Sequence, residues 1–334
     1  ADNLLYLLKT TGRVPNAARS VYLNKSQPPI LPMLVREAAP VREAQEGRES
    51  TDRWLSEAHD LMARDYDGFW CRVGPSERGI DQIEGHQVRL ARYGGDNSKF
   101  AMDESGFDTT SRFEGRALDV VPVELNSFLW QYARQMEDTA RTLAEHAREK
   151  GDIQAVGTWT TKAARWQAEA ATRKADLIRW CWDEEDGMFR DRVFQGEGQG
   201  LMKSQDSLAP TVAPIWVGML DPKDPKEARM LERSLDNLAR FEKEHGPAAM
   251  ASDYGHPEMQ WNGPSGWAPL TMMTLEAQAE GGRYDAVVRN ATRWLDTIQR
   301  NHDQDGVILE RYNVETGGPP PIQKGRYEET QGEG

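Results

Sequence analysis

Carboxyl side chains gather around one glycine in a way that suits acid–base chemistry. Asp103, Glu104 and Asp108 flank Gly106, and Arg112 follows Asp108 at the spacing of one helical turn. A carboxylic acid beside a guanidinium in an aromatic setting can have its pKa tuned and its proton aimed by its surroundings. The alternative is structural, because Asp108 precedes Thr-Thr-Ser-Arg-Phe and would make a good N-cap for a helix there. Residue types alone leave both interpretations open.

A second segment, QWNGPSGWAPL at residues 260–270, combines two tryptophans with a proline-glycine loop. Trp261 and Trp267 carry flat apolar rings with one polar edge, which suit the faces of sugar rings. The pattern predicts a sugar-stacking wall at the mouth of a cavity, just ahead of a helix. A buried loop held in place by its tryptophans would give the same pattern, so that alternative also stays open.

The third segment is the tail RYEETQGEG at residues 326–334. Glu328 and Glu329 lie among glycines, where the backbone can approach a ligand closely. An acidic pair near a chain terminus is ordinarily solvated surface. This segment alone therefore predicts no site.

Composition and charge exclude several other classes of protein. The net charge of −13 over 334 residues argues against a nucleic-acid binder, which needs a basic stripe. No apolar run approaches the roughly 18 residues of a membrane span. The six histidines form no metal-ligand pair, and two cysteines, Cys71 and Cys181, exclude a disulfide framework while leaving one bridge open. We expect no metal, no cofactor and no membrane or nucleic-acid partner.

Helical periodicity dominates the chain. Apolar residues recur every three or four positions from Leu125 to Ala147 and again from Trp159 to Trp180. Gly151-Asp152 interrupts the pattern and predicts two antiparallel helices joined by a short loop. No segment alternates like a long strand and no linker divides the chain, so we predict an all-α fold with one domain over residues 1–334. Further helices are expected at 225–245, 269–280 and 284–301.

Three glycines suggest an internal period. Gly68, Gly187 and Gly306 are separated by 119 residues each, and each follows acidic residues and precedes a short extended apolar piece. This predicts helices that end in left-handed caps. The equal spacing indicates about two helical hairpins per period, and hairpins stacked around an axis form an α/α toroid. A calcium loop is the competing interpretation, but Tyr312 replaces the glutamate that the best copy would need.

In order along the chain, these segments resemble trehalases of glycoside hydrolase family 37. The motifs span about residues 4–334. ESGFDTTSRF is similar to the family's Glu-Ser-Gly-Trp-Asp-Phe-Ser-Ser-Arg-Trp, and QWNGPSGWAPL is similar to its signature Gln-Trp-Asp-x-Pro-Asn-Gly-Trp-Ala-Pro. VPNAARSVYLNKSQPP resembles its Arg-Ser-Gln-Pro-Pro segment, and VPVELN resembles its Val-Pro-Val-Asp-Leu-Asn. LERYNV corresponds to Glu-Lys-Tyr-Asp-Val, which precedes a catalytic glutamate.

The resemblance implies an (α/α)6 barrel, a toroid here apparently lacking part of its first and last helices. It implies an inverting glycoside hydrolase that cleaves an α-glucosidic bond, with trehalose as the leading substrate. Asp108 matches the family's general acid. Glu328 matches the general base, with Glu329 as its rival. Further positions line the sugar pocket in the family, and they correspond here to Asn16, Lys25, Gln27, Arg112, Trp261 and Trp267.

Some features depart from the family pattern. Lys25 stands where trehalases carry arginine, and the Arg-Pro-Glu-Ser stretch ahead of the acid motif is absent. Hydrolases of glucosylglycerate, mannosylglycerate or other α-glucosides in family 63 are therefore the nearest alternative. Motifs expected before Ala1 and after Gly334 are also missing, which favours an incomplete chain. A non-catalytic toroid that binds carbohydrate is the alternative of another class. No leader is visible, which favours the cytoplasm.

Overall fold

The computed structural model describes residues 1–17, 23 and 25–320, and its contacts divide the chain into two compact units. The first unit comprises Ala1–Gly106 and Leu125–Arg179. The second comprises Phe107–Glu124 and Trp180–Gly334. Asp108, Arg112 and the predicted tryptophan loop therefore belong to the same unit, the second.

Helices make up most of the first unit. Two of them cross its limits, because the first two residues of α5 and the last two of α6 belong to the second unit. After α3 the chain continues into a π-helical turn, η2 (Tyr66–Trp70). The helices are α1 (Asp2–Thr11), α2 (Leu31–Glu46), α3 (Arg48–Asp65), α4 (Ser98–Glu104), α5 (Val123–Glu149) and α6 (Ile153–Cys181).

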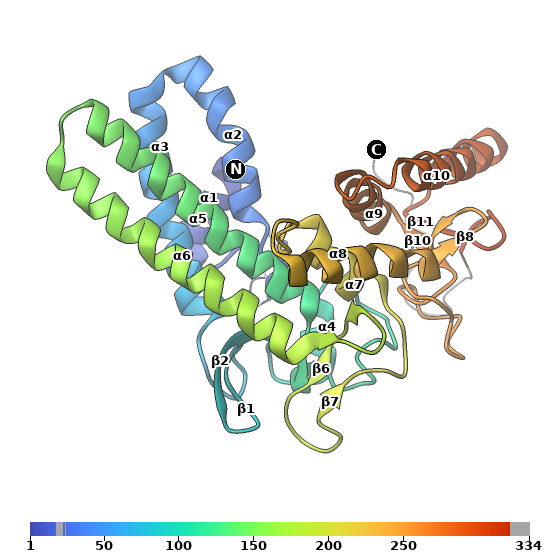
Figure 1. Cartoon of the computed structure of the whole chain (residues 1–334). Helices are drawn as coiled ribbons and strands as arrows, with labels where there is room; N and C mark the ends of the chain where they lie inside the picture. Colours follow the sequence, from blue (N-terminus) through green and yellow to red (C-terminus); the bar gives the residue numbers. More distant parts are fainter. Residues whose placement is uncertain (18–22, 24, 321–334) are drawn as a thin grey trace. The chain divides into compact units, whose positions relative to one another are not determined.

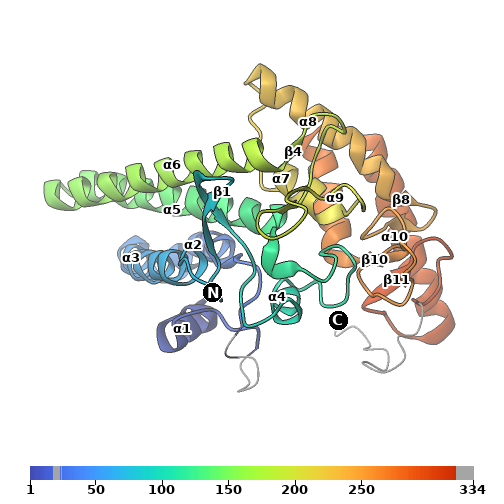
Figure 2. The same ribbon diagram turned by 90° about the horizontal axis from the view of Figure 1, so that it is seen from below.

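The predicted helical hairpin is confirmed by α5 and α6. The two helices lie side by side in both views (Figures 1 and 2). Gly151 turns the chain between them with a φ of 73°, a backbone region that glycine enters without a Cβ clash. The long apolar stripes of both helices allowed this pair to be predicted from the sequence.

An aromatic cluster forms part of the core of the first unit. The Tyr66 ring meets the Trp166 ring edge-on at a centroid distance of 5.1 Å and the Tyr132 ring at 5.2 Å. Buried Arg173 donates from Nε to the Tyr66 hydroxyl at 2.9 Å. The charge of Arg173 is balanced in part by Glu169, whose Oε1 lies 3.3 Å from Nη2. The buried guanidinium of Arg173 and the hydroxyl of Tyr66 are stable at this depth because each has a hydrogen-bond partner.

A β-hairpin of β1 (Gly79–Ile83) and β2 (His86–Ala91) is fixed to α5 by one side chain. Asn126 accepts a bond from the Ala91 amide and donates one to the Ala91 carbonyl, each at 2.8 Å. Arg173 of α6 donates to the same amide oxygen at 2.9 Å. The residues on either side of the hairpin are thereby held at a defined place in the unit.

In its described part, the second unit contains four α-helices and several two- or three-residue strands. The helices expected at 269–280 and 284–301 are confirmed as α9 and α10. Within the described ranges, no strand exceeds six residues, in agreement with the all-α prediction. The helices are α7 (Leu208–Trp216), α8 (Pro225–Asn237), α9 (Ala268–Glu280) and α10 (Tyr284–Asp305).

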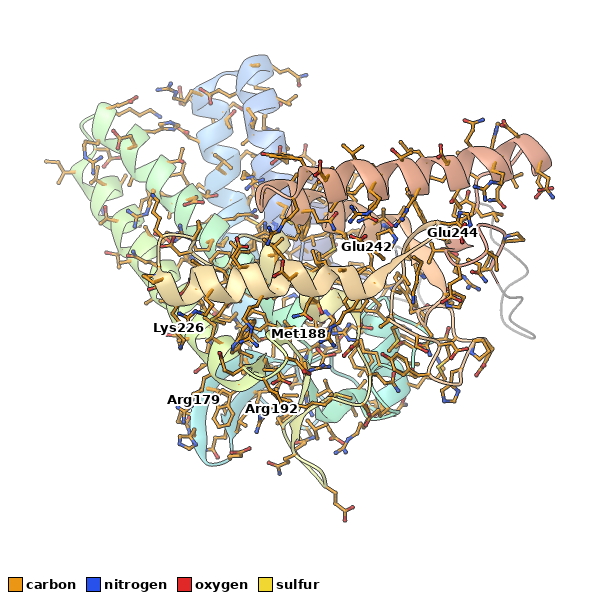
Figure 3. All side chains as sticks on the ribbon, turned by 45° about the vertical axis from the view of Figure 1, so that its right-hand side comes forward. Arg179, Met188, Arg192, Lys226, Glu242 and Glu244 are labelled. Carbon is orange, nitrogen blue, oxygen red and sulfur yellow. The ribbon has the colours of Figure 1, made fainter. Side chains whose placement is uncertain are left out.

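The predicted end of the third helical segment at residue 245 is wrong, because α8 ends at Asn237. A 3-10 turn, η4 (Leu238–Phe241), then leads into the hairpin of β8 (Glu242–Lys243) and β9 (Gly246–Pro247). Figure 3 labels Glu242 just beyond the end of the helix. Its carboxylate accepts bonds from three side chains of α9 and α10, which draws the chain out of the helical path: Gln278, Arg289 and Asn290.

The predicted glycine caps are confirmed at one of three places. Gly306 ends α10 in the left-handed region with a φ of 73°, and its amide bonds to the His302 carbonyl at 2.7 Å. Gly187 also has a positive φ, but it closes the turn between β4 (Trp182–Asp183) and β5 (Met188–Phe189). Gly68 lies inside the π-helical turn η2. The similar sequences around these three glycines therefore form three different kinds of turn.

Cys71 and Cys181 are both free and buried, so the bridge left open by the sequence does not form. Burial raises the pKa of both thiols. Across the described ranges, no helix has the length and apolar character needed to cross a membrane.

Candidate active site

Asp108 lies in an irregular segment and does not cap a helix. From Thr109 to Arg116 the backbone forms bends, turns and irregular structure without a helix, and a 3-10 turn, η3 (Ala117–Asp119), follows. The helix-cap interpretation of Asp108 is therefore wrong. The Asp108 side chain is half-buried. Asp103 and Glu104, predicted to cluster with it, belong to the first unit.

The segment after Asp108 is bonded to the loop that carries the tryptophans. The Thr109 carbonyl accepts a bond from the Trp261 amide at 3.1 Å, and the Thr109 hydroxyl accepts one from the Gln260 amide at 3.2 Å. Ser111 donates from Oγ to Gln205 at 2.5 Å. Two of the three segments singled out from the sequence thus meet in one place.

Trp261 and Trp267 stack on one another. Their ring centroids lie 3.8 Å apart with an interplanar angle of 5°. Phe107 meets Trp261 edge-on at 4.7 Å. Trp267 is only 6% exposed and donates from Nε1 to the Gln260 carbonyl at 2.9 Å. Trp261 is the more exposed of the two rings, and sugar stacking by this pair stays a prediction.

Arg112 is buried between two carboxylates. Its Nε and Nη2 bind Asp191 at 2.6 and 2.9 Å, and Nη2 also binds Glu124. Burial alone would lower the pKa of Arg112, but the two carboxylates raise it above the ordinary value. Burial also raises the pKa of Glu124. In the described part of the chain the remaining nitrogen, Nη1, is buried and has no hydrogen-bond partner. The sugar contact of Arg112 stays a prediction.

The other predicted binding residues meet in the first unit. The Asn16 amide donates to the Lys25 carbonyl at 2.9 Å. Lys25 Nζ lies 3.4 Å from the Asp103 carboxylate and 5.1 Å from the centre of the Phe100 ring. Gln27 lies against Gly106, where its Oε1 would be 3.3 Å from any added Cβ. Their contact with substrate stays a prediction.

Glu104 organises this group, a role that the sequence did not reveal. It is fully buried and accepts bonds from Arg78 at 2.6 and 3.1 Å, from the Ser26 amide at 3.1 Å and from the Gly94 amide at 3.0 Å. Charge-assisted bonds of this kind are among the strongest in proteins. In the sequence, Glu104 stands out only as one of the carboxyl groups that flank Gly106 and as the first residue of the ESGFD motif.

Glu328 and Glu329, predicted as general base and rival, lie outside the described residues. The base assignment therefore stays a prediction. Among the residues that are described, no group of three or more His, Cys, Asp or Glu side chains is placed to hold a metal ion.

Comparisons with known proteins place the chain in a family. The trehalase family model matches residues 1–99 and 86–334. Cytosolic neutral trehalase of Saccharomyces cerevisiae is 25% identical over 377 aligned positions, which cover 98% of this chain and 48% of the relative. The chain thus spans about half the length of that curated relative.

Solved structures give the same fold. The neutral trehalase Nth1 from Saccharomyces cerevisiae matches with a TM-score of 0.72 and 22% identity, over 94% of this chain and 64% of that one. A GH63 mannosylglycerate hydrolase from Thermus thermophilus matches with a TM-score of 0.61 and 15% identity, over 91% and 74%. The predicted all-α fold class, that of the (α/α)6 barrels, is thereby confirmed. With the family model covering its whole length, the chain belongs to the trehalase family.

Proposed function

We propose that the protein is an inverting glycoside hydrolase that cleaves an α-glucosidic bond, with trehalose as its leading substrate. In this proposal Asp108 is the general acid and Glu328 the general base. Inverting enzymes use two such carboxyl groups roughly 6.5–9.5 Å apart, so that one protonates the leaving oxygen while the other activates a water molecule. The name of the yeast relative, a cytosolic neutral trehalase, supports this proposal. A cytoplasmic location rests on the same name.

The observation that carries the proposal is the position of Asp108 beside the tryptophan loop. The Asp108 segment is fastened to Gln260 and Trp261 through Thr109, in a stretch of chain that does not begin a helix. A half-buried acid on a braced loop next to a partly exposed indole suits proton donation to a bound sugar.

A second substrate class is favoured by Lys25. Trehalases carry arginine there, and a lysine offers a compact positive charge in place of a bidentate fork. Lys25 has Asp103 beside it at 3.4 Å, and such a charge also suits a substrate with a carboxylate. Glucosylglycerate and mannosylglycerate carry one, so they are the second candidates.

The test is hydrolysis by the purified full-length protein of trehalose, glucosylglycerate, mannosylglycerate and kojibiose, with the released anomer followed by proton NMR. We expect β-glucose from an α-glucoside, and no turnover by Asp108→Asn. Asp285→Asn, which alters an exposed carboxylate in the first turn of α10, is the matched control and should retain activity.

The contrary result is equally specific. If no glycoside is turned over and Asp108→Asn matches the wild type in every assay, the hydrolase proposal fails. Sugar binding without turnover would then favour the non-catalytic carbohydrate-binding toroid.

A further inference from the structure

Asn262 belongs to the tryptophan loop, and its side chain is fully buried against the Asp108 segment. Its Oδ1 accepts bonds from the Ser111 amide at 3.0 Å and the Thr110 hydroxyl at 3.3 Å. Its Nδ2 donates to Ser111 Oγ at 2.9 Å and to the Asp253 carbonyl at 3.0 Å. One side chain therefore holds the second and third residues after Asp108.

The orientation of this amide is fixed by backbone groups. The Ser111 amide can only donate, so it requires an oxygen, and the Asp253 carbonyl can only accept, so it requires an N–H. Reversing the amide would set donor against donor and acceptor against acceptor. The His256 carbonyl, 3.5 Å from Nδ2, lies on the same side as the Asp253 carbonyl. A neutral group that both donates and accepts is what this position requires.

The family signature quoted above has aspartate where this chain has Asn262. A carboxylate would keep the bonds from Ser111 and Thr110 but would have no proton for the Asp253 carbonyl. It would also bring a negative charge into a buried place beside carbonyl oxygens, which is unfavourable. Asparagine in place of aspartate therefore fits this site, because its Nδ2 group makes the donor bonds that a carboxylate could not make.

We propose that Asn262 is a positioning residue, whose neutral amide fixes the residues after Asp108 to the tryptophan loop and thereby sets where the Asp108 carboxyl group points. This inference rests on the proposed function. It goes beyond it because Asn262, which takes no part in the reaction itself, is given the role of orienting the Asp108 carboxyl group. Small misplacements of a reacting group cost large factors in rate, of the order of 100-fold for about 1 Å.

The test compares Asn262→Ala with a matched control, Asn290→Ala. Asn290 is equally buried in the same unit, but its Nδ2 donates to Glu242 at 3.0 Å and Gln278 at 3.2 Å, away from the Asp108 segment. Both variants lose a buried amide, so both should lower the melting temperature. On the substrate that the wild type hydrolyses, we expect kcat to fall about 10- to 100-fold in Asn262→Ala, with KM changed far less. In Asn290→Ala, kcat should stay within about twofold.

Asn262→Asp adds a readout that a merely structural role would not move. It keeps the acceptor for the Ser111 amide, so kcat should recover part of the loss seen in Asn262→Ala. The new negative charge disfavours ionisation of a nearby acid. The alkaline limb of the kcat–pH profile should therefore move to higher pH than in the wild type.

Hydrogen exchange supplies a readout that does not depend on turnover. We expect faster amide exchange at residues 109–111 in Asn262→Ala and unchanged exchange there in Asn290→Ala. Equal kcat losses in the two alanine variants, with equal exchange at 109–111, would overturn the inference. An inactive wild type would instead overturn the proposed function, and the exchange result would still decide whether Asn262 holds the segment.

Discussion

Arg112 binds Asp191 through two of its nitrogens, Nε and Nη2, at 2.6 and 2.9 Å. Asp191 also accepts a bond from the Val123 amide at 2.9 Å, at the first residue of α5. Both side chains are almost wholly buried. The pair thus ties the turn after Asp108 to the start of a helix.

Removing one member of this pair should be costly. Asp191→Ala leaves a buried guanidinium with Glu124 as its remaining carboxylate and removes the acceptor for the Val123 amide. We expect the free energy of unfolding to fall by about 3–5 kcal/mol. Asp236→Ala, which breaks the exposed pair with Arg283, should change it by less than about 1 kcal/mol. Urea denaturation of both variants checks this, and similar losses would contradict it.

A buried acid in the first unit should make stability fall as pH rises. Burial raises the pKa of Asp65 from 3.8 to about 7. Its contribution to stability is therefore complete below pH 3.8 and is lost as the pH rises through 7. Relative to the wild type, Asp65→Asn should gain about 4 kcal/mol between about pH 3 and pH 8.

The Tyr132 hydroxyl provides the companion experiment. It donates to Asp65 at 3.2 Å and so lowers the pKa of that carboxyl group. Tyr132→Phe should move the upper end of the pH window to higher values, as measured by urea denaturation across pH. Parallel wild-type and Asp65→Asn curves would contradict the prediction, because the carboxyl group would then have the same pKa in the folded and unfolded states.

His59 should have the opposite pH dependence. Burial, with Lys162 nearby, lowers its pKa from 6.5 to about 4. The contribution of a depressed imidazole is complete above pH 6.5 and is lost as the pH falls through 4. From about pH 8 to pH 3 the wild type should lose about 3 kcal/mol relative to His59→Gln. Lys162→Met should narrow this window, because it removes a charge that opposes protonation. A His59 ring that titrates by NMR near pH 6.5 would contradict the prediction.

The two stacked tryptophans should separate binding from stability. Trp261→Ala is expected to raise KM about 10-fold with a smaller effect on kcat, because a partly exposed aromatic face is lost from the substrate side. Trp267→Ala removes a ring that is 6% exposed and should lower the free energy of unfolding by about 3–5 kcal/mol. Steady-state kinetics and denaturation together check this, and the reverse pattern would exchange the two roles.

The elements that could be predicted from the sequence are those determined by local patterns of apolar residues. The stripes of α5 and α6 repeat over many turns, and both helices form where expected, as do α9 and α10. The end of α8 was misplaced because it depends on Glu242, whose partners lie 36 to 48 residues further along the chain. The helix that Asp108 would cap does not form, since Asn262 and Asp191 hold the next turns from 151 and 79 residues away. Contacts between residues so far apart in the chain produce no periodic pattern in the sequence.

The two buried thiols lie in different units of the chain. Cys71 belongs to the first unit and Cys181 to the second, and neither is bonded to the other. A buried neutral thiol reacts with an alkylating reagent only when its surroundings open. The alkylation rates of Cys71 and Cys181, distinguished by mass spectrometry of the labelled peptides, therefore report separately on the opening of the structure around each cysteine.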